Sequence, residues 1–157
     1  MSLVGESEMY KNILLATELG EQNRYVEDKA AAIQKLTNSK LSIIHVIEPI
    51  PQAYYTGAEL GLNDSYAETS EILVKNANKL LLPIIERLNI PESNMIIATG
   101  KVSKEILLYA EKRDVDLIVI GSHGRHGLQL LLGSTANAVL HGAKCDVLAV
   151  RFQQENQ

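Results

Sequence analysis

Short runs of branched aliphatic residues alternate along the chain with longer stretches in which apolar residues recur every three or four positions. Five of the short runs predict β-strands, at residues 12–17, 41–47, 94–99, 116–121 and 145–152. The stretches between them predict amphipathic helices, marked by Val26, Ala30, Ile33 and Leu36, by Ile72, Leu73, Ala77, Leu80, Leu81, Ile84, Ile85 and Leu88, by Val102, Ile106, Leu107 and Ala110, and by the segment from Thr135 to His141, which Gly142 would stop.

This alternation predicts the fold class. Because the strands are apolar on both faces and a helix follows each of the first four, we expect right-handed crossovers into a parallel sheet. The expected architecture is a doubly wound, Rossmann-like α/β fold, a five-stranded parallel sheet with strand order 3-2-1-4-5 and helices on both faces. Pro83 lies inside the second helical pattern, where a proline removes a backbone hydrogen bond, so we expect it to kink or divide that helix.

The pattern delimits one domain, residues 9–152, with residues 1–8 as a disordered N-terminal segment and residues 153–157 as a flexible C-terminus. Residues 48–65 interrupt the alternation with two prolines, two glycines and a pair of tyrosines, which predicts a long loop. Such a loop could be a lid, a partner surface or a tolerated insertion.

Composition narrows the function classes. The chain has 157 residues, 46% of them hydrophobic, and a net charge of −4 without a cluster of basic residues, which argues against nucleic acid as a partner. No apolar run approaches the about 20 residues that span a bilayer, and the first residues lack the features of a signal peptide, so we expect no membrane partner. A single cysteine, Cys145, excludes an internal disulfide and a CxxC metal site and favours a reduced, cytoplasmic setting.

A glycine-rich segment, GSHGRHGLQLLLGST at residues 121–135, directly follows the fourth predicted strand. Its spacing is that of neither a P-loop nor the GxGxxG fingerprint. In the expected strand order, it lies opposite Thr17 and Glu18 at the point where the order reverses, the usual ligand position in open α/β sheets. Glycines allow close backbone approach, and a helix start offers free amides, so the segment suits an anionic ligand.

Alternatives remain for several of these residues. The glycines could serve turn chemistry alone, and His123 could be a ligand contact or a hydrogen-bonded turn residue. Ser134 could be a helix N-cap, a phosphate contact or both. His45, in the middle of the second strand, is expected to be a hydrogen-bonded core histidine. Cys145 is expected to serve packing.

Two long segments resemble a known family. VDLIVIGSHGRHGLQLLLGSTANAVLHGAKCDVLAVR resembles the C-terminal half of a universal stress protein, and YKNILLATEL with LSIIHV resembles the N-terminal half. The resemblance covers about residues 9–152. It implies an adenine nucleotide alpha-hydrolase-like fold, usually homodimeric, and a role in survival under stress.

Members of this family that bind ATP carry the pattern G-x2-G-x9-G-[ST]. Here Gly121 and Gly124 match its opening and Gly133-Ser134 its close, but eight residues instead of nine separate Gly124 from Gly133. The aspartate usual after the first strand is replaced by Glu18, which is one methylene longer.

The resemblance implies a set of contacts to an adenine nucleotide. The backbone of Ala16 and Val46 would lie near the adenine and Glu18 near the sugar. The phosphates would lie among Gly121, His123, Gly124, Gly133 and Ser134. Apart from the resemblance, the helix-start amide of Thr135 and the positive charge of Arg125 suit the same anionic ligand.

The resemblance implies a stress-response regulator, and with the single cysteine and the glycine-rich segment it favours a cytoplasmic protein whose cofactor is ATP or another adenine nucleotide; no metal is assigned. The alternative is a dimeric stress protein without nucleotide that acts through protein contacts. An enzyme is disfavoured because the sequence has no Walker-type carboxylates, phosphate-loop lysine, HExxH motif or Ser-His-Asp spacing. The last strand is apolar and would lie at an edge of the sheet, where charged side chains normally prevent pairing with another chain. Arg151 is the only charge in this strand that would protect the edge in this way, so we expect a homodimer through this strand.

Overall fold

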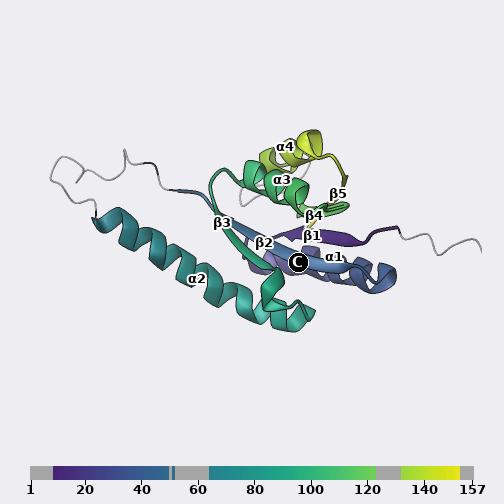
Figure 1. The fold of residues 1–157 in the computed structure, drawn as a ribbon, viewed down its shortest axis with the longest axis horizontal. Helices are drawn as coiled ribbons and strands as arrows, with labels where there is room; N and C mark the ends of the chain where they lie inside the picture. Colours follow the sequence, from purple (N-terminus) through teal and green to yellow (C-terminus); the bar gives the residue numbers. More distant parts are fainter. Residues whose placement is uncertain (1–8, 50, 52–63, 123–131, 153–157) are drawn as a thin grey trace, which may run out of the picture.

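A computed structural model describes residues 9–49, 51, 64–122 and 132–152 (Figure 1). The five strands are β1 (Asn12–Ala16), β2 (Lys40–Ile47), β3 (Met95–Thr99), β4 (Leu117–Gly121) and β5 (Asp146–Val150). The helices are α1 (Arg24–Thr37), α2 (Asp64–Leu88), α3 (Val102–Lys112) and α4 (Ser134–Gly142), with short 3-10 turns η1 (Glu21–Asn23) and η4 (Glu92–Asn94). Most of the predicted 48–65 loop lies outside the described residues, as do the predicted disordered N-terminal segment, residues 1–8, and the predicted flexible C-terminus, residues 153–157.

The strands form one parallel sheet in the order β3-β2-β1-β4-β5, which confirms the predicted topology. β1 pairs with β2 on one side, with Ala16 opposite Ile44, and with β4 on the other, with Ala16 opposite Ile120. The strand order therefore reverses at the carboxyl end of β1, between the two strands that flank it.

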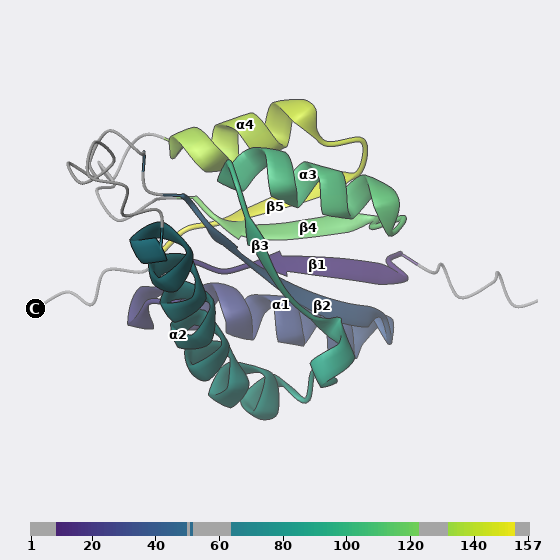
Figure 2. The ribbon, with the colours of Figure 1, turned by 60° about the vertical axis from the view of Figure 1, so that its left-hand side comes forward.

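Each face of the sheet is covered by two helices (Figure 2). Leu14 and Leu15 are neighbours in β1, and both are fully buried, on opposite faces of the sheet. The core on the face of Leu15 includes Val26 of α1 and Leu81 of α2. The core on the face of Leu14 is completed by Ile106 of α3 and Val139 of α4. Apolar strands buried on both faces thus produce the expected three-layer arrangement.

Three local expectations need correction. Leu36 does not belong to the buried face of α1, since it is 87% exposed. α4 begins at Ser134 and includes Gly142, so that glycine is the last helical residue and no stop. α2 continues through Pro83 as one helix of 25 residues, so the proline does not divide it. We expected Pro83 either to kink the helix or to divide it, and the expectation that it divides the helix is wrong.

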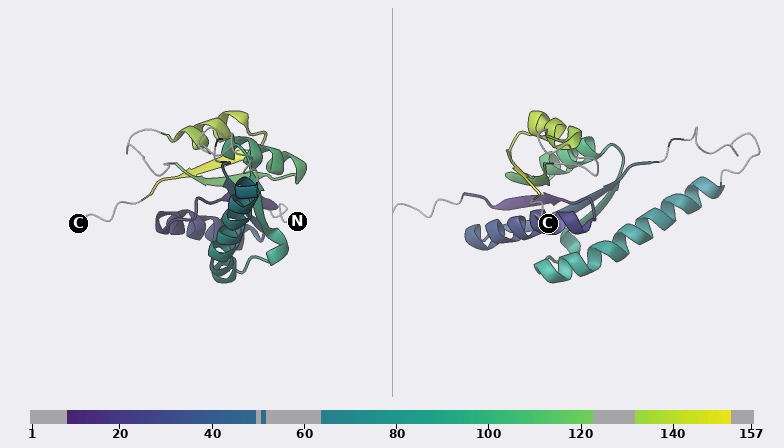
Figure 3. Two further views of the ribbon diagram at one scale, coloured as in Figure 1. Left: turned by 90° about the vertical axis from the view of Figure 1, so that its left-hand side faces the viewer. Right: turned by 180° about the vertical axis from the view of Figure 1, so that it is seen from behind.

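α2 connects the core to the carboxyl ends of the strands. Its second half packs on the sheet through Leu81 and Ile85, while its amino-terminal half extends past the strand ends (Figures 1 and 3). None of the helices in the described parts of the chain is long and apolar enough to cross a membrane.

Candidate functional site

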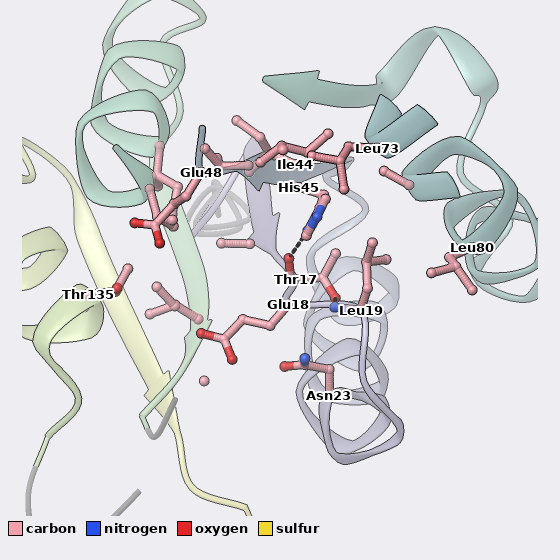
Figure 4. A pocket seen from close by; sticks show the side chains of 18 of the residues that line it. Thr17, Glu18, Leu19, Asn23, Ile44, His45, Glu48, Leu73, Leu80 and Thr135 are labelled. Atoms are coloured by element: carbon pink, nitrogen blue, oxygen red, sulfur yellow. Dashed lines mark hydrogen bonds between the residues drawn. The ribbon is translucent and has the colours of Figure 1, made fainter. Parts of the chain in front are cut away.

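A cavity of about 540 Å³ opens at the carboxyl ends of β1, β2 and β4 (Figure 4). Its walls come from these strand ends, from the connection after β1, from α2 and α3, and from the first turn of α4. The cavity therefore lies at the reversal of strand order, where ligands of open α/β sheets bind.

The structure brings five of the ten predicted site residues to this cavity. They are Ala16, Glu18, Val46, Gly121 and Thr135. Gly133 and Ser134 directly precede Thr135 at the start of α4 but do not line the cavity. His123, Gly124 and Arg125 lie outside the described residues.

The carboxyl end of β1 is held by hydrogen bonds to β2 and within the connection that follows it. The amide of Thr17 donates to the carbonyl of Ile44 at 3.0 Å, and Nδ1 of His45 donates to the carbonyl of Thr17 at 2.9 Å. The hydroxyl of Thr17 accepts the amide of Leu19 at 3.3 Å. His45 thus makes the bond expected of a core histidine and also lines the cavity.

Behind this wall lies a buried carboxylate. Glu27, in the first turn of α1, is 3% exposed, and its Oε1 accepts the hydroxyl of Thr17 at 3.2 Å. Its Oε2 accepts a hydrogen bond from Arg87, in the last turn of α2, which also pairs with Asp28 at the surface. Burial raises the pKa of Glu27 above the ordinary carboxyl value, although Arg87 and Thr17 act to lower it.

Two carboxylates face the cavity. Glu18 follows β1 and Glu48 follows β2, and Figure 4 shows both side chains directed toward the side of the cavity that Thr135 lines. Among the described lining residues there is no lysine or arginine. The described walls can therefore accept hydrogen bonds from hydroxyl or amino groups, but they offer no cationic side chain to a phosphate.

The start of α4 supplies a different chemistry. Gly133 is the N-cap residue, and no side chain caps the helix, so the alternative that Ser134 is the N-cap is wrong. The amide of Gly133 donates to the carbonyl of Ser122 at 2.6 Å, which fixes the helix start beside the end of β4. An uncapped helix start presents amide groups and a partial positive charge to an anion.

Gly121 closes the end of β4 against the C-terminal part of the chain. A Cβ atom at this position would lie 2.9 Å from Cζ of Phe152. The absence of a side chain at Gly121 therefore lets the ring of Phe152 pack directly against the backbone at the cavity edge.

Sequence reasoning missed the contributions of α2 and of the second acid. Leu73, Asn76 and Leu80 line the cavity from a helix that begins after the 48–65 segment, and no motif links them to the strand ends. Glu48 could have been found, since it directly follows β2 just as Glu18 follows β1.

Comparison with known proteins agrees with this geometry. Residues 9–151 match the model of the universal stress protein family. Universal stress protein A homologs 1 and 2 of Coxiella burnetii are 40% and 43% identical to this chain over 145 residues, which cover 92% of it and 99% and 97% of the relatives. The chain belongs to the universal stress protein family. The resemblance found in the sequence is thereby confirmed.

Solved structures have the same fold. A hypothetical protein whose biochemical function was assigned from its structure aligns with a TM-score of 0.76 at 27% identity, over 94% of this chain and 99% of its own. UspA from Lactobacillus plantarum aligns with a TM-score of 0.73 at 21% identity, over 90% and 98%. A universal stress protein crystallised in complex with cAMP aligns with a TM-score of 0.63 at 20% identity, over 92% and 98%.

Proposed function

We propose that this universal stress protein binds an adenine nucleotide in the cavity at the reversal of strand order, and that it acts in the cytoplasm as a stress-response regulator by binding, not by catalysis. The observation that carries the proposal is the cavity itself. Its volume of about 540 Å³ falls within the range of small-molecule sites, and Ala16, Glu18, Val46, Gly121 and Thr135 all line it.

The walls differ in a way that suits the parts of a nucleotide. Apolar residues from the strand ends and from α3, among them Val46, Ile106 and Ile120, form a surface on which an adenine ring would be buried. The carboxylate of Glu18 would accept hydrogen bonds from ribose hydroxyls. The start of α4, near Thr135, would receive phosphate oxygens on backbone amides.

His123 and Gly124, which the sequence resemblance assigns to the phosphates, would complete the phosphate side together with the positive charge of Arg125. Two features of the sequence bear on affinity: the loop between Gly124 and Gly133 is one residue short of the binding pattern, and Glu18 replaces an aspartate. The relative crystallised with cAMP supports the proposal in that this fold accommodates an adenine nucleotide.

The direct test is the small-molecule content of protein purified without added nucleotide, followed by calorimetric titration with ATP, ADP and cAMP. Gly133→Val should weaken binding at least about tenfold because a branched side chain crowds the helix start, whereas Gly133→Ala should weaken it less. Absence of bound nucleotide, together with no heat at millimolar concentrations of all three, would refute the proposal. The family alternative, action through protein contacts without nucleotide, would then be favoured.

We also propose that the protein is a homodimer joined through β5. This strand is an edge of the sheet, and Leu148 within it is 37% exposed, so pairing of two such edges would cover unpaired backbone groups and apolar surface. Sedimentation should detect a dimer at micromolar concentration. Leu148→Lys should shift it toward monomer, whereas Leu108→Lys on α3, where the leucine is 41% exposed, should not. A monomeric wild type would refute this arrangement.

A further inference from the structure

Thr17 occupies the centre of a hydrogen-bond network behind the cavity wall. Its amide and carbonyl bond to β2, at Ile44 and His45, and its hydroxyl bonds both to Leu19 ahead of it and to Glu27 behind it. The residue is 5% exposed, so these protein groups form its main hydrogen-bond environment.

The roles of the hydroxyl group follow from its single proton. An ionised Glu27 can only accept, so the hydroxyl of Thr17 must donate its proton to Oε1 of Glu27. The oxygen lone pairs of the hydroxyl then point toward the connection after β1, where the amide of Leu19 donates to them. The carboxylate therefore orients the hydroxyl that receives this amide.

The backbone at Leu19 needs such support. Leu19 has a φ of 60°, in the left-handed region that a leucine rarely adopts. The hydrogen bond from the amide of Leu19 to the hydroxyl of Thr17 closes a small turn around Glu18. The turn that holds Leu19 therefore also sets the direction of the Glu18 side chain. Thr17, Glu18 and Leu19 all line the cavity.

Arg87 links this arrangement to α2. Its guanidinium pairs with Oε2 of Glu27, and the side chain of Arg87 is 29% exposed. The middle of the same helix supplies Leu73, Asn76 and Leu80 to the cavity lining, and Figure 4 shows Leu73 and Leu80 on the α2 side of the cavity. The buried carboxylate of Glu27 is thus in contact both with the connection after β1 and with α2, and both of these line the cavity.

We propose that Glu27 is a positioning residue of the binding site: through the hydroxyl of Thr17 it fixes the turn that carries Glu18 and Leu19, and through Arg87 it fixes α2 relative to that turn. Glu27 does not itself line the cavity, so its effect on a ligand is indirect. The proposal rests on the proposed nucleotide binding for its affinity readout but not for its structural readout.

The test pairs isosteric and conservative variants. Thr17→Val keeps the shape but removes the hydroxyl, and Glu27→Met keeps a long buried side chain without an acceptor; each should raise the Kd for ATP about tenfold. Thr17→Ser keeps the hydroxyl and should stay within about twofold of wild type. Asp28→Asn is the matched control, because it removes the negative charge of the exposed partner of Arg87 and leaves the Glu27 pair in place.

A second readout does not depend on nucleotide. Amide hydrogen exchange of residues 17–23 should become at least about tenfold faster in Thr17→Val and Glu27→Met, and stay unchanged in Thr17→Ser and Asp28→Asn. If Thr17→Val and Glu27→Met match wild type in both readouts, the proposal is wrong. If wild type binds no nucleotide, the proposed function fails, and the exchange rates alone then decide the role of Glu27.

Discussion

Nδ1 of His45 lies 2.9 Å from the backbone carbonyl of Thr17, so a side chain of β2 holds the residue that directly follows β1 at the edge of the cavity. A carbonyl oxygen can only accept, which places a proton on Nδ1. Because Thr17 lies directly beyond β1, this bond extends the attachment between the two strands past their regular ladder.

Loss of this bond should be measurable as a loss of stability. We expect His45→Leu to lower the free energy of unfolding by about 1 kcal/mol, since the carbonyl of Thr17 loses a hydrogen-bond partner in a mostly buried place. Urea unfolding at pH 8 measures it. His141→Gln, at an exposed histidine in the last turn of α4, is the control and should change stability little. Equal effects of the two substitutions would contradict the role given to His45.

Gly100, between β3 and α3, should not tolerate alanine. Its φ is 151°, and an added Cβ would lie 2.8 Å from Oε1 of Glu105. We expect Gly100→Ala to cost about 1–3 kcal/mol of stability because an L-residue is strained in this conformation. Gly20→Ala is the matched control, since Gly20 has a φ of −119° and the nearest atom to its added Cβ is 4.0 Å away. Thermal unfolding of both variants would separate backbone strain from the general effect of replacing glycine.

The pH dependence of stability should carry a contribution from Glu27. Because burial raises its pKa in the folded state, the folded protein binds the proton more tightly than the unfolded chain, whose value is near 4.5. This contribution is fully present below that value and is lost as the pH rises through the folded pKa. Glu27→Gln has no titrating group at this position and lacks this contribution. The difference in free energy of unfolding between Glu27→Gln and wild type should therefore shift in favour of the variant as the pH rises from 4 to 8.

Chemical unfolding of both proteins at several pH values measures this difference. A difference between Glu27→Gln and wild type that stays constant over the whole range would show that the pKa of Glu27 is not raised in the folded protein.

Cys145 should behave as a packing residue. It lies just before β5, packs against the core beneath α3 and α4, and burial raises the pKa of its thiol, with the charges of Asp116 and Asp146 acting in the same direction. The thiol is therefore mostly protonated at neutral pH, and thiolate is the reactive form. We expect slow reaction with a disulfide reagent compared with a free thiol, and no change in ligand binding or oligomeric state in Cys145→Ser. Rapid labelling at pH 7 would contradict this.

The fold was predictable because its signals are local and repeated. Branched aliphatic residues on both faces of each strand, such as Leu14 and Leu15, are sufficient to indicate a sheet buried between helix layers. The positions at which helices end were harder to predict than the strands. Leu36 fits the helical period, but it lies at the end of α1 beyond the edge of the core, and Pro83 is accommodated within a long helix.

The site was predictable where residues lie at the end of a strand, directly follow one or begin a helix. Glu18 follows from the rule that ligands bind at the carboxyl ends of parallel strands, and Thr135 follows from the free amides of a helix start. Ala16 and Val46 were assigned by the family resemblance. Glu27 and Arg87 are 60 residues apart in the sequence and belong to helices whose patterns mark them only as polar. Their meeting depends on how α1 and α2 pack, which the pattern of apolar residues does not specify.

The two acids at the cavity should set its preference for ligand charge. Glu48 adds a negative charge to a wall that already holds Glu18, and like charges repel a polyanion more than a neutral ligand of the same shape. We therefore expect Glu48→Gln to tighten binding of ATP about threefold at low salt and to leave adenosine within about 1.5-fold, with the gain for ATP shrinking in high salt. Glu86→Gln, at an exposed position near the end of α2, is the control. Calorimetric titration at two salt concentrations measures the Kd of wild type, Glu48→Gln and Glu86→Gln for ATP and for adenosine. An equal effect of Glu48→Gln on both ligands would mean that Glu48 acts through shape or hydrogen bonding and not through its charge.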